Sequence, residues 1–393
     1  MERDYVFRRG GSPFRRPSRR RGPPWIVWVL LALALIVGIT VLIIRLAGGS
    51  EEPAPESSQL ASTASASSQD LIPTPAPTPE PTSTAPPQTA PDSAPQDIGG
   101  LMVVNGGAYE YYHFSEEATN KYITTVANAG NALSGATLYN IVVPTAMDVR
   151  LPDSYLTEHN VDSSDQRKAI DRYIYPSIHA MNPNVKTVPL INALASHYTE
   201  HIYFDSDRTW TQLGAYYAYE QFCQVKGIQA VSLDQFEKKS YEGFMGSFAS
   251  QVGEEALYMD TVDAYYSSAN TSLDFTDSDG VTQEGFAVIA NGDDYDSSLL
   301  YLIFAAGDQP YKVLHNSDLN DGSACVVVQE SFGNFFIPFL TSHYQDVYVV
   351  DYRSYTGNVP ELASQVSASD VIILTNVIMT STDSAVDTFA SLF

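Results

Sequence analysis

Between residues 101 and 393, short apolar runs alternate with helical patterns. The apolar runs cover residues 137–143, 185–190, 286–290, 299–304, 324–329, 347–350 and 371–375. Val, Ile and Leu fill them without regular polar alternation, so we expect strands that are buried on both faces. The helical patterns cover residues 115–133, 164–181, 211–226, 335–343 and 360–366. This alternation predicts an α/β fold with a parallel sheet between two layers of helices, and a site beyond the carboxyl ends of its strands.

Residues 243–285 interrupt this alternation. The stretch is rich in Ser, Asp, Tyr and Gly, and we interpret it as an insertion of short strands and loops within the domain. Asp277-Ser-Asp-Gly280 has the spacing that opens a calcium-binding loop, but the other ligands of the twelve-residue pattern are missing. We therefore expect an acidic turn there.

The N-terminal part predicts a membrane anchor. Residues 25–44 contain no charged side chain, and a helix of that length spans about 30 Å, the thickness of a hydrocarbon core. The run exceeds the apolar core of a cleavable signal peptide, about 7–15 residues. We therefore expect residues 25–46 to form an uncleaved transmembrane signal anchor. Residues 1–24 carry eight arginines against two acidic residues. This charge bias predicts that residues 1–24 are a basic cytoplasmic tail and that the C-terminal domain is extracellular.

Residues 47–99 form a predicted stalk. Ser, Thr, Ala, Pro and Glu dominate them, and proline recurs through residues 73–81. Such a composition cannot bury enough apolar surface to fold, and its proline-rich part favours an extended polyproline II chain. We expect a disordered stalk that holds the domain of residues 100–393 away from the membrane.

The charge balance and the cysteines limit the range of partners. The formal net charge is −25, and such an acidic chain repels phosphate backbones, so we expect no nucleic-acid partner. Cys223 lies in a helical pattern and Cys325 in an apolar strand, which favours two buried thiols and leaves a single disulfide as the alternative. No Cys/His cluster has zinc spacing, and we expect neither a metal nor a cofactor.

One segment carries a family resemblance. Residues 201–219, His-Ile-Tyr-Phe-Asp-Ser-Asp-Arg-Thr-Trp-Thr-Gln-Leu-Gly-Ala-Tyr-Tyr-Ala-Tyr, resemble the signature of the DHHW proteins, a bacterial family related to the SGNH-type O-acetyltransferases of alginate assembly. The Asp-His-His-Trp motif falls on Asp207, Arg208, Thr209 and Trp210, so both ends match and both histidines are replaced. Further segments resemble the family in order, at residues 140–146, 307–310, 326–340 and 343–353. The resemblance implies an SGNH-like sandwich for the extracellular domain.

The resemblance also implies a catalytic frame. In the related acetyltransferases, the Asp and the second His of the motif activate a Ser at the end of a core strand. Carried over by position, the nucleophile is Ser331, the orienting carboxylate is Asp207, and the position of the base holds Thr209. A serine hydroxyl needs a base within hydrogen-bond reach, and imidazole suits this because its pKa lies near neutrality. Threonine cannot take that proton, and losing such a base typically removes about 10⁴–10⁶ of the rate.

No other histidine is well placed to replace the missing base. His197 and His201 precede the motif, and His201 lies roughly 20 Å from the motif aspartate if the chain stays extended. His343 follows the predicted nucleophile by twelve residues, or about 18 Å along a straight helix. His315 lies on a predicted loop and stays open as a substitute base.

Structural roles compete with catalytic ones at these positions. Serine is a favoured helix cap, and without a base we favour a cap over a nucleophile for Ser331. The alternatives for Asp207 are an ion pair with Arg208 or a cap on the helix at residues 211–226. For the aromatic cluster of Trp210, Tyr216, Tyr217 and Tyr219 we favour packing over contact with a sugar.

The sequence therefore predicts a membrane-anchored extracellular SGNH-like domain that is catalytically degenerate. We expect it to act as a binding or scaffold protein on a cell-envelope polysaccharide or on a partner such as a membrane-bound acyltransferase. The alternative is an active O-acyltransferase or esterase on envelope polysaccharide, with Ser331 and an unconventional base. The candidate binding residues are Arg208, Trp210, Glu330 and Asn334.

Overall fold

The computed structural model describes residues 88–393. The predicted basic tail, the predicted anchor and most of the predicted stalk lie outside the described residues. Within residues 88–393, no helix combines the length and the apolar character that a membrane span requires. Residues 96–98, which the sequence places in the stalk, form strand β1 (Gln96–Ile98) and pair with β2 (Leu101–Val104).

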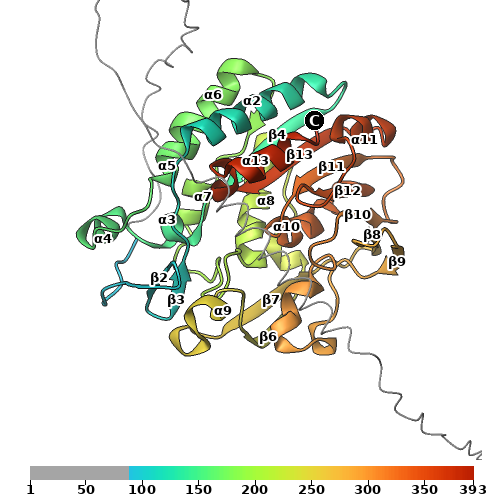
Figure 1. The fold of residues 1–393 in the computed structure, drawn as a ribbon. Helices are drawn as coiled ribbons and strands as arrows, with labels where there is room; N and C mark the ends of the chain where they lie inside the picture. The colour runs from blue at the N-terminus through green and yellow to red at the C-terminus, as the bar shows by residue number, and fades with distance from the viewer. Residues whose placement is uncertain (1–87) are drawn as a thin grey trace, which may run out of the picture. The chain divides into compact units, whose positions relative to one another are not determined.

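An eight-stranded mixed sheet forms the centre of the domain (Figure 1). Its strands, in spatial order, are β5 (Lys186–Thr187), β4 (Thr137–Val143), β13 (Asp370–Asn376), β11 (Ala324–Gln329), β12 (Asp346–Asp351), β10 (Tyr311–Asn316), β8 (Thr271–Thr276) and β9 (Thr282–Phe286). The first five are parallel, whereas the last three pair antiparallel. The prediction of a wholly parallel sheet is therefore wrong on this side. The insertion supplies β8 and β9 as a hairpin, and a short turn can only join antiparallel strands.

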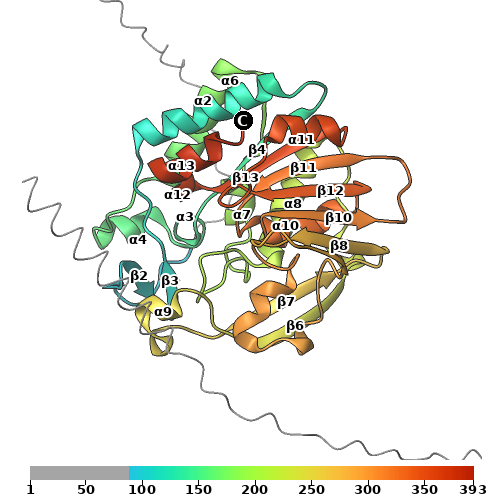
Figure 2. The ribbon, with the colours of Figure 1, turned by 45° about the vertical axis from the view of Figure 1, so that its right-hand side comes forward.

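The central strands are buried on both faces, as predicted. In β11, Cys325 and Val327 pack into one hydrophobic cluster, whereas Val326 and Val328 pack into another. The second cluster is covered by α2 (Glu116–Ala132), α6 (Tyr175–Met181), α11 (Val359–Gln365) and α13 (Asp383–Ala390). The first is covered by α8 (Gln212–Lys226) and α10 (Gly333–Leu340). Figure 2 shows the two helical layers on opposite faces of the sheet, which makes the domain an α/β fold.

The apolar runs predict some strands exactly and misplace others. Residues 137–143 and 324–329 coincide with β4 and β11. Residues 299–304 were predicted as a strand but lie mostly in the 3₁₀ helix η5 (Ser297–Ile303). Leu300 and Ile303 are buried there while Leu299 is exposed, and such spacing is compatible with a 3₁₀ turn. A short apolar run does not separate these two structures by its period alone.

Other predictions hold only in part. Residues 185–190 contribute just the two-residue β5, and residues 286–290 contribute the end of β9 and one isolated bridge. The helix predicted at 164–181 is divided into α5 (Gln166–Ala169), a π-helical turn η1 (Ile170–Ile174) and α6. The expected buried thiols are confirmed, since Cys223 and Cys325 are free and buried, and the disulfide alternative is wrong.

Two small sheets accompany the central one. β1, β2 and β3 (Gly107–Tyr109) form one, and β6 (Glu237–Phe244) pairs with β7 (Asp260–Tyr266) in the other. β2 and β3 lie at the lower side of the molecule together with β6 and β7 in both views (Figures 1 and 2). The loops between these sheets and the central strands carry the candidate site.

Candidate active site

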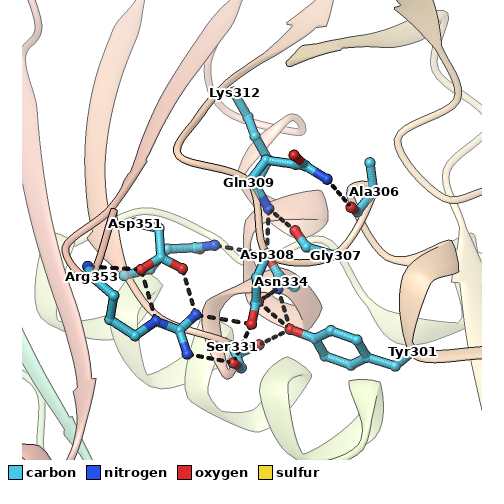
Figure 3. Close-up of polar contacts among 11 residues, drawn as sticks. Tyr301, Ala306, Gly307, Asp308, Gln309, Lys312, Ser331, Asn334, Asp351 and Arg353 are labelled. Atoms are coloured by element: carbon cyan, nitrogen blue, oxygen red, sulfur yellow. Dashed lines mark hydrogen bonds and ion pairs between the residues drawn. The ribbon is translucent and has the colours of Figure 1, made fainter. Parts of the chain in front are cut away.

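Ser331 lies where β11 ends and α10 is about to begin, at the strand end that the sequence predicted. The N-cap of α10 is Phe332, and no side chain caps this helix. The preferred expectation of a helix cap at Ser331 is therefore wrong. The hydroxyl instead donates to Asp308 Oδ2 at 2.7 Å, across the gap between two strand ends (Figure 3).

Both carboxylate oxygens of Asp308 are contacted by hydrogen-bond donors from neighbouring side chains. Its Oδ2 also contacts the Arg353 guanidinium at 2.9 Å, while Oδ1 accepts from Asn334 Nδ2 at 2.6 Å and from the Tyr301 hydroxyl. Burial alone would raise the pKa of this carboxyl, but Arg353 and the hydrogen bonds from Tyr301 and Ser331 lower the pKa below its usual value. Asp308 is consequently a stable anion and a weak proton acceptor.

A strained turn presents Asp308 to Ser331. Ala305, Ala306 and Gly307 have φ values of 47°, 57° and 66° in succession. The left-handed region costs an alanine roughly 1–3 kcal/mol, so surrounding contacts must hold the turn. Lys312 Nζ supplies one of them by donating to the Gly307 carbonyl at 2.7 Å.

Lys312 and Gln329 orient the amide of Asn334. Lys312 is fully buried, and this burial lowers its pKa to about 7. Its Nζ donates to Asn334 Oδ1 at 2.5 Å, and Gln329 Nε2 donates to the same oxygen at 2.8 Å. With the carbonyl oxygen occupied, the NH₂ group of Asn334 faces Asp308, as Figure 3 shows. Asn334, expected to contact a ligand, is fully buried and supports the carboxylate instead.

Arg353 reaches the site from the end of β12. Its guanidinium forms a two-pronged pair with Asp351, with Nε to Oδ1 at 2.8 Å and Nη2 to Oδ2 at 2.5 Å. Nη1 donates to Ser331 Oγ at 3.1 Å. Burial alone would lower the pKa of Arg353, but Asp351 and Asp308 raise it, so the group stays charged. Sequence reasoning missed Asp308, Asp351 and Arg353 as site residues, although the segments that carry them, 307–310 and 343–353, were part of the resemblance.

The motif loop holds Thr209 against Asp207. Asp207 Oδ1 accepts from both the backbone N–H of Thr209, at 3.0 Å, and its hydroxyl, at 2.8 Å. Asp207 Oδ2 accepts from the backbone N–H of Ser247 at 2.8 Å. The threonine hydroxyl therefore binds the carboxylate that would orient an imidazole at this position.

Neither structural alternative for Asp207 holds. Arg208 pairs with Glu110 rather than with its neighbour, and the hydroxyl of Thr211 caps α8 by accepting from Gly214 N. The Asp207 carboxylate instead accepts from Thr209 within its own loop and from the backbone N–H of Ser247 in another segment.

Asp260, on β7, fixes the start of the motif loop, and the sequence did not single it out. Its Oδ1 accepts from the backbone N–H of Asp205 at 2.9 Å and contacts His201 Nε2 at 2.9 Å. Its Oδ2 accepts from the backbone N–H and the hydroxyl of Ser206, at 2.9 and 2.5 Å. Four contacts to one buried carboxylate make the loop a rigid support for the motif.

Trp210 and Glu330 lie beneath the site rather than within it. The Trp210 indole is fully buried, and its Nε1 donates to the Phe332 carbonyl at 2.8 Å, which ties the motif to the turn that carries Ser331. Glu330 is buried and accepts from the backbone N–H of Asn376 at 2.8 Å. The favoured prediction of packing for Trp210 is confirmed, whereas Glu330, a candidate binding residue, is buried and supports the site instead.

The motif loop and the predicted nucleophile share one cavity of about 450 Å³. Among the predicted binding residues, Arg208 lines it. The cavity is lined by Asp207, Arg208, Thr209, Ser247, Ser250, Gln251, Tyr301, Asp308 and Ser331. The structure therefore brings the motif loop, with Asp207 and Thr209, next to Ser331, although Ser331 follows the loop by more than a hundred residues along the chain.

Residues 80–350 match the family model described as DHHW protein. The chain belongs to the DHHW family. A DHHW family protein from Eubacterium siraeum has a similar structure, with a TM-score of 0.65 and 23% identity over 77% of this chain and 99% of that chain. PatB1 from Bacillus cereus, in a structure with a sulfonyl adduct, has a TM-score of 0.55 and 14% identity over 74% of this chain and 97% of that one. These two likenesses show the fold.

A further structural match is the O-acetyltransferase domain of AlgJ from Pseudomonas putida, with a TM-score of 0.42 and 10% identity over 74% of this chain and 91% of that one. No curated protein matches the sequence.

All seven histidines of this DHHW protein lie within the described residues, and each has its contacts elsewhere. Ser331 Oγ donates to Asp308 Oδ2 and accepts from Arg353 Nη1. The contacts of the histidines are His113 with Tyr111, His159 with the Tyr155 carbonyl, His179 with Thr187, His197 with Glu200, His201 with Asp260, His315 with Asp346 and His343 with Tyr219.

Glu330 is expected to lower the free energy of unfolding of this DHHW protein as the pH rises from about 5 to about 8. Burial raises the pKa of this carboxyl from 4.5 to about 7. Between these values the folded state holds a proton that the unfolded chain has lost. The stabilisation is therefore complete below the unfolded pKa and is lost as the pH rises through the folded pKa.

The variant Glu330→Gln should reduce this pH dependence by about 2–3 kcal/mol, because it keeps the acceptor for Asn376 N without a titrating group. Urea denaturation at the two pH values measures the difference. Asp148, whose pKa burial also raises to about 7, acts with the same sign and leaves a residual slope in the variant. An unchanged slope in Glu330→Gln would show that this carboxyl is ionised throughout.

Proposed function

We propose that this DHHW protein binds a cell-envelope polysaccharide in the cavity at Ser331 without transferring or removing acyl groups. The observation that carries the proposal is the environment of Ser331 Oγ, which contacts a carboxylate and a guanidinium where an acyl-transfer site needs a base. Thr209 occupies the position of the base in the family motif, and its hydroxyl donates to Asp207 Oδ1. A serine without a base is a weak nucleophile, so the site is better suited to binding.

The dimensions and the lining of the cavity support a hydroxyl-rich ligand. Its volume of about 450 Å³ falls in the range of small-ligand sites, roughly 300–1,000 Å³. Hydroxyl, amide, carboxylate and guanidinium groups line it, and these are donors and acceptors that match sugar hydroxyls. Ser331, in this proposal, is one hydrogen-bonding group among several.

A second function is favoured by one contact. Ser331 Oγ donates to Asp308 Oδ2 at 2.7 Å, which is the geometry of a nucleophile and its base. This would make the protein an O-acyltransferase or esterase on envelope polysaccharide with Asp308 as an unconventional base. The lowered pKa of Asp308 and the donors on both of its oxygens argue against that role.

The location is part of the proposal. We place the domain outside a bacterial cell, on a stalk, with residues 25–46 as the membrane anchor. A membrane-bound acyltransferase is the partner that an inactive relative of the acetyltransferases would serve, by presenting the glycan to it.

A sulfonyl fluoride distinguishes the two functions, because it modifies an activated serine. We expect the full chain, purified in detergent, to show no adduct at Ser331 by mass spectrometry. PatB1, which forms a sulfonyl adduct, serves as the positive control. We also expect no turnover of acetylated glycans, together with binding of at least one envelope polysaccharide.

The outcome that supports the enzyme is an adduct on the wild-type chain that is absent in Ser331→Ala and in Asp308→Asn. In that case Asp308 is a working base and the binding proposal fails.

A further inference from the structure

A second cavity, of about 380 Å³, lies beside the N-terminal sheet and shares no lining residue with the cavity at Ser331. We propose that it is a binding subsite for an uncharged pyranose chain. The side chains that would contact the ligand are those of Gln96, Asp97, Tyr111, His113 and Asn160. The class of ligand, a polysaccharide, rests on the proposed function. The contacts that support the subsite do not involve Ser331.

Two nearly parallel rings give the cavity an aromatic surface. Tyr111 and His113 are stacked, with centroids 6.5 Å apart and planes inclined by 16°. Tyr112, between them, is fully buried and its hydroxyl contacts Ser381 Oγ, so alternate side chains of this segment point to opposite sides. A pyranose ring has an apolar C–H face that packs on such a surface while its hydroxyls remain at the rim.

Polar groups at the rim match those hydroxyls. Tyr111 donates its hydroxyl to Asp97 Oδ2 at 3.0 Å, which holds both side chains in place. The amides of Gln96 and Asn160 add donors and acceptors to the lining. An aromatic face with a few convergent polar groups is the usual composition of a small-ligand site.

Two of the lining segments, residues 111–113 and 159–162, are tied to one another through hydrogen bonds of the residues beside them. The backbone N–H of Tyr112 donates to Ser163 Oγ at 3.1 Å, and the backbone N–H of Ser164 donates to the Tyr112 carbonyl at 2.6 Å. The Ser164 hydroxyl in turn accepts from Phe114 N at 3.0 Å. The aromatic face therefore exists before any ligand arrives, which lowers the entropic cost of binding.

Charge selects against an anionic glycan. The lining includes Asp97 and Asp162 but no Lys or Arg. A neighbouring hollow shares Asn160, Val161 and Asp162 with it, adds three more aspartates, and is likewise lined without Lys or Arg. Uronate or phosphate groups would be repelled there, whereas an uncharged chain would not.

The segment with Tyr111 and His113 is connected to the cavity at Ser331 by an ion pair. Glu110, next to Tyr111, pairs with Arg208, which lines the cavity at Ser331. From Glu110 to His113 an extended chain covers about 10 Å. A single short segment of the chain therefore connects the lining of both cavities, and the test below asks whether one glycan occupies both.

Calorimetric titration of the full chain in detergent tests the subsite, with N-acetylated chitohexaose as the uncharged probe and an alginate hexamer as the anionic one. We expect chitohexaose to bind at least about tenfold more tightly than the alginate hexamer. Tyr111→Ala and His113→Ala should each weaken its binding about three- to tenfold, the loss expected for one aromatic contact. Tyr111→Phe keeps the ring and should bind nearly as the wild type does, and Tyr295→Ala, an exposed tyrosine that lines neither cavity, is the matched control.

Ser250→Trp, which places an indole in the wall of the Ser331 cavity, separates this inference from the proposed function. Weaker binding in both Tyr111→Ala and Ser250→Trp supports one chain across both cavities, and weaker binding in Tyr111→Ala alone supports the subsite but not the function of the Ser331 cavity. Weaker binding in Ser250→Trp alone overturns the subsite and leaves the proposed function standing. Unaffected variants, tighter binding of the alginate hexamer, or no binding of chitohexaose each overturn the subsite.

Discussion

The double variant Arg208→His with Thr209→His is expected to gain esterase activity at least about 100-fold above that of the wild type. The replacements restore the family motif, and the imidazole at position 209 would take the acceptor Asp207 Oδ1 that now binds the Thr209 hydroxyl. The motif loop and Ser331 already line one cavity, so an imidazole at position 209 would share that cavity with the Ser331 hydroxyl. Removal of the base from such a constellation typically costs about 10⁴–10⁶ of the rate, which leaves room for a gain of this size.

Hydrolysis of an acetyl ester by the purified full chain measures this gain. The same double variant with Ser331→Ala should lose the gained activity, and Arg208→Ala with Thr209→Ala is the control for the loss of the wild-type side chains. If the double-histidine variant folds but stays inactive, the missing base is not the only defect. The hydrogen bonds of Ser331 Oγ with Asp308 and Arg353 would then be the second defect.

Trp210→Ala should lower the free energy of unfolding by about 3–5 kcal/mol, the range for truncating a large buried aromatic side chain. The indole is fully buried. Its Nε1 donates a hydrogen bond to the Phe332 carbonyl, which joins the motif loop to the turn that carries Ser331. Chemical denaturation of the full chain in detergent gives the change. Trp210→Phe keeps most of the packing and loses the hydrogen bond, so it should cost roughly 1–2 kcal/mol.

A cost below about 1 kcal/mol in Trp210→Ala would contradict this account, because it would mean that the indole is not a support of the site. The Trp210→Phe variant separates packing from hydrogen bonding. An equal loss in both variants would assign the whole effect to the bond with Phe332.

Local pattern and motif order predicted more of the fold than of the site. The buried runs at 137–143 and 324–329 lie on both faces of a sheet, and an unbroken stretch of Val and Ile carries that information by itself. The same reasoning misplaced η5, because its apolar residues have a spacing that a strand and a 3₁₀ helix both tolerate. The antiparallel side of the sheet depended on where the inserted hairpin docks, which no local period encodes.

The residues at the family positions can be read from the amino-acid sequence, including Thr209 at the position of the base. The contacts of Ser331 depend on how the sheet is assembled. Asp308 and Arg353 lie 23 and 22 residues from Ser331 in opposite directions. They meet it because β10 begins beside the positions where β11 and β12 end. Side-chain period and propensity report on neighbours within a few residues, whereas a hydrogen-bond partner across strands is selected by how the whole sheet is assembled.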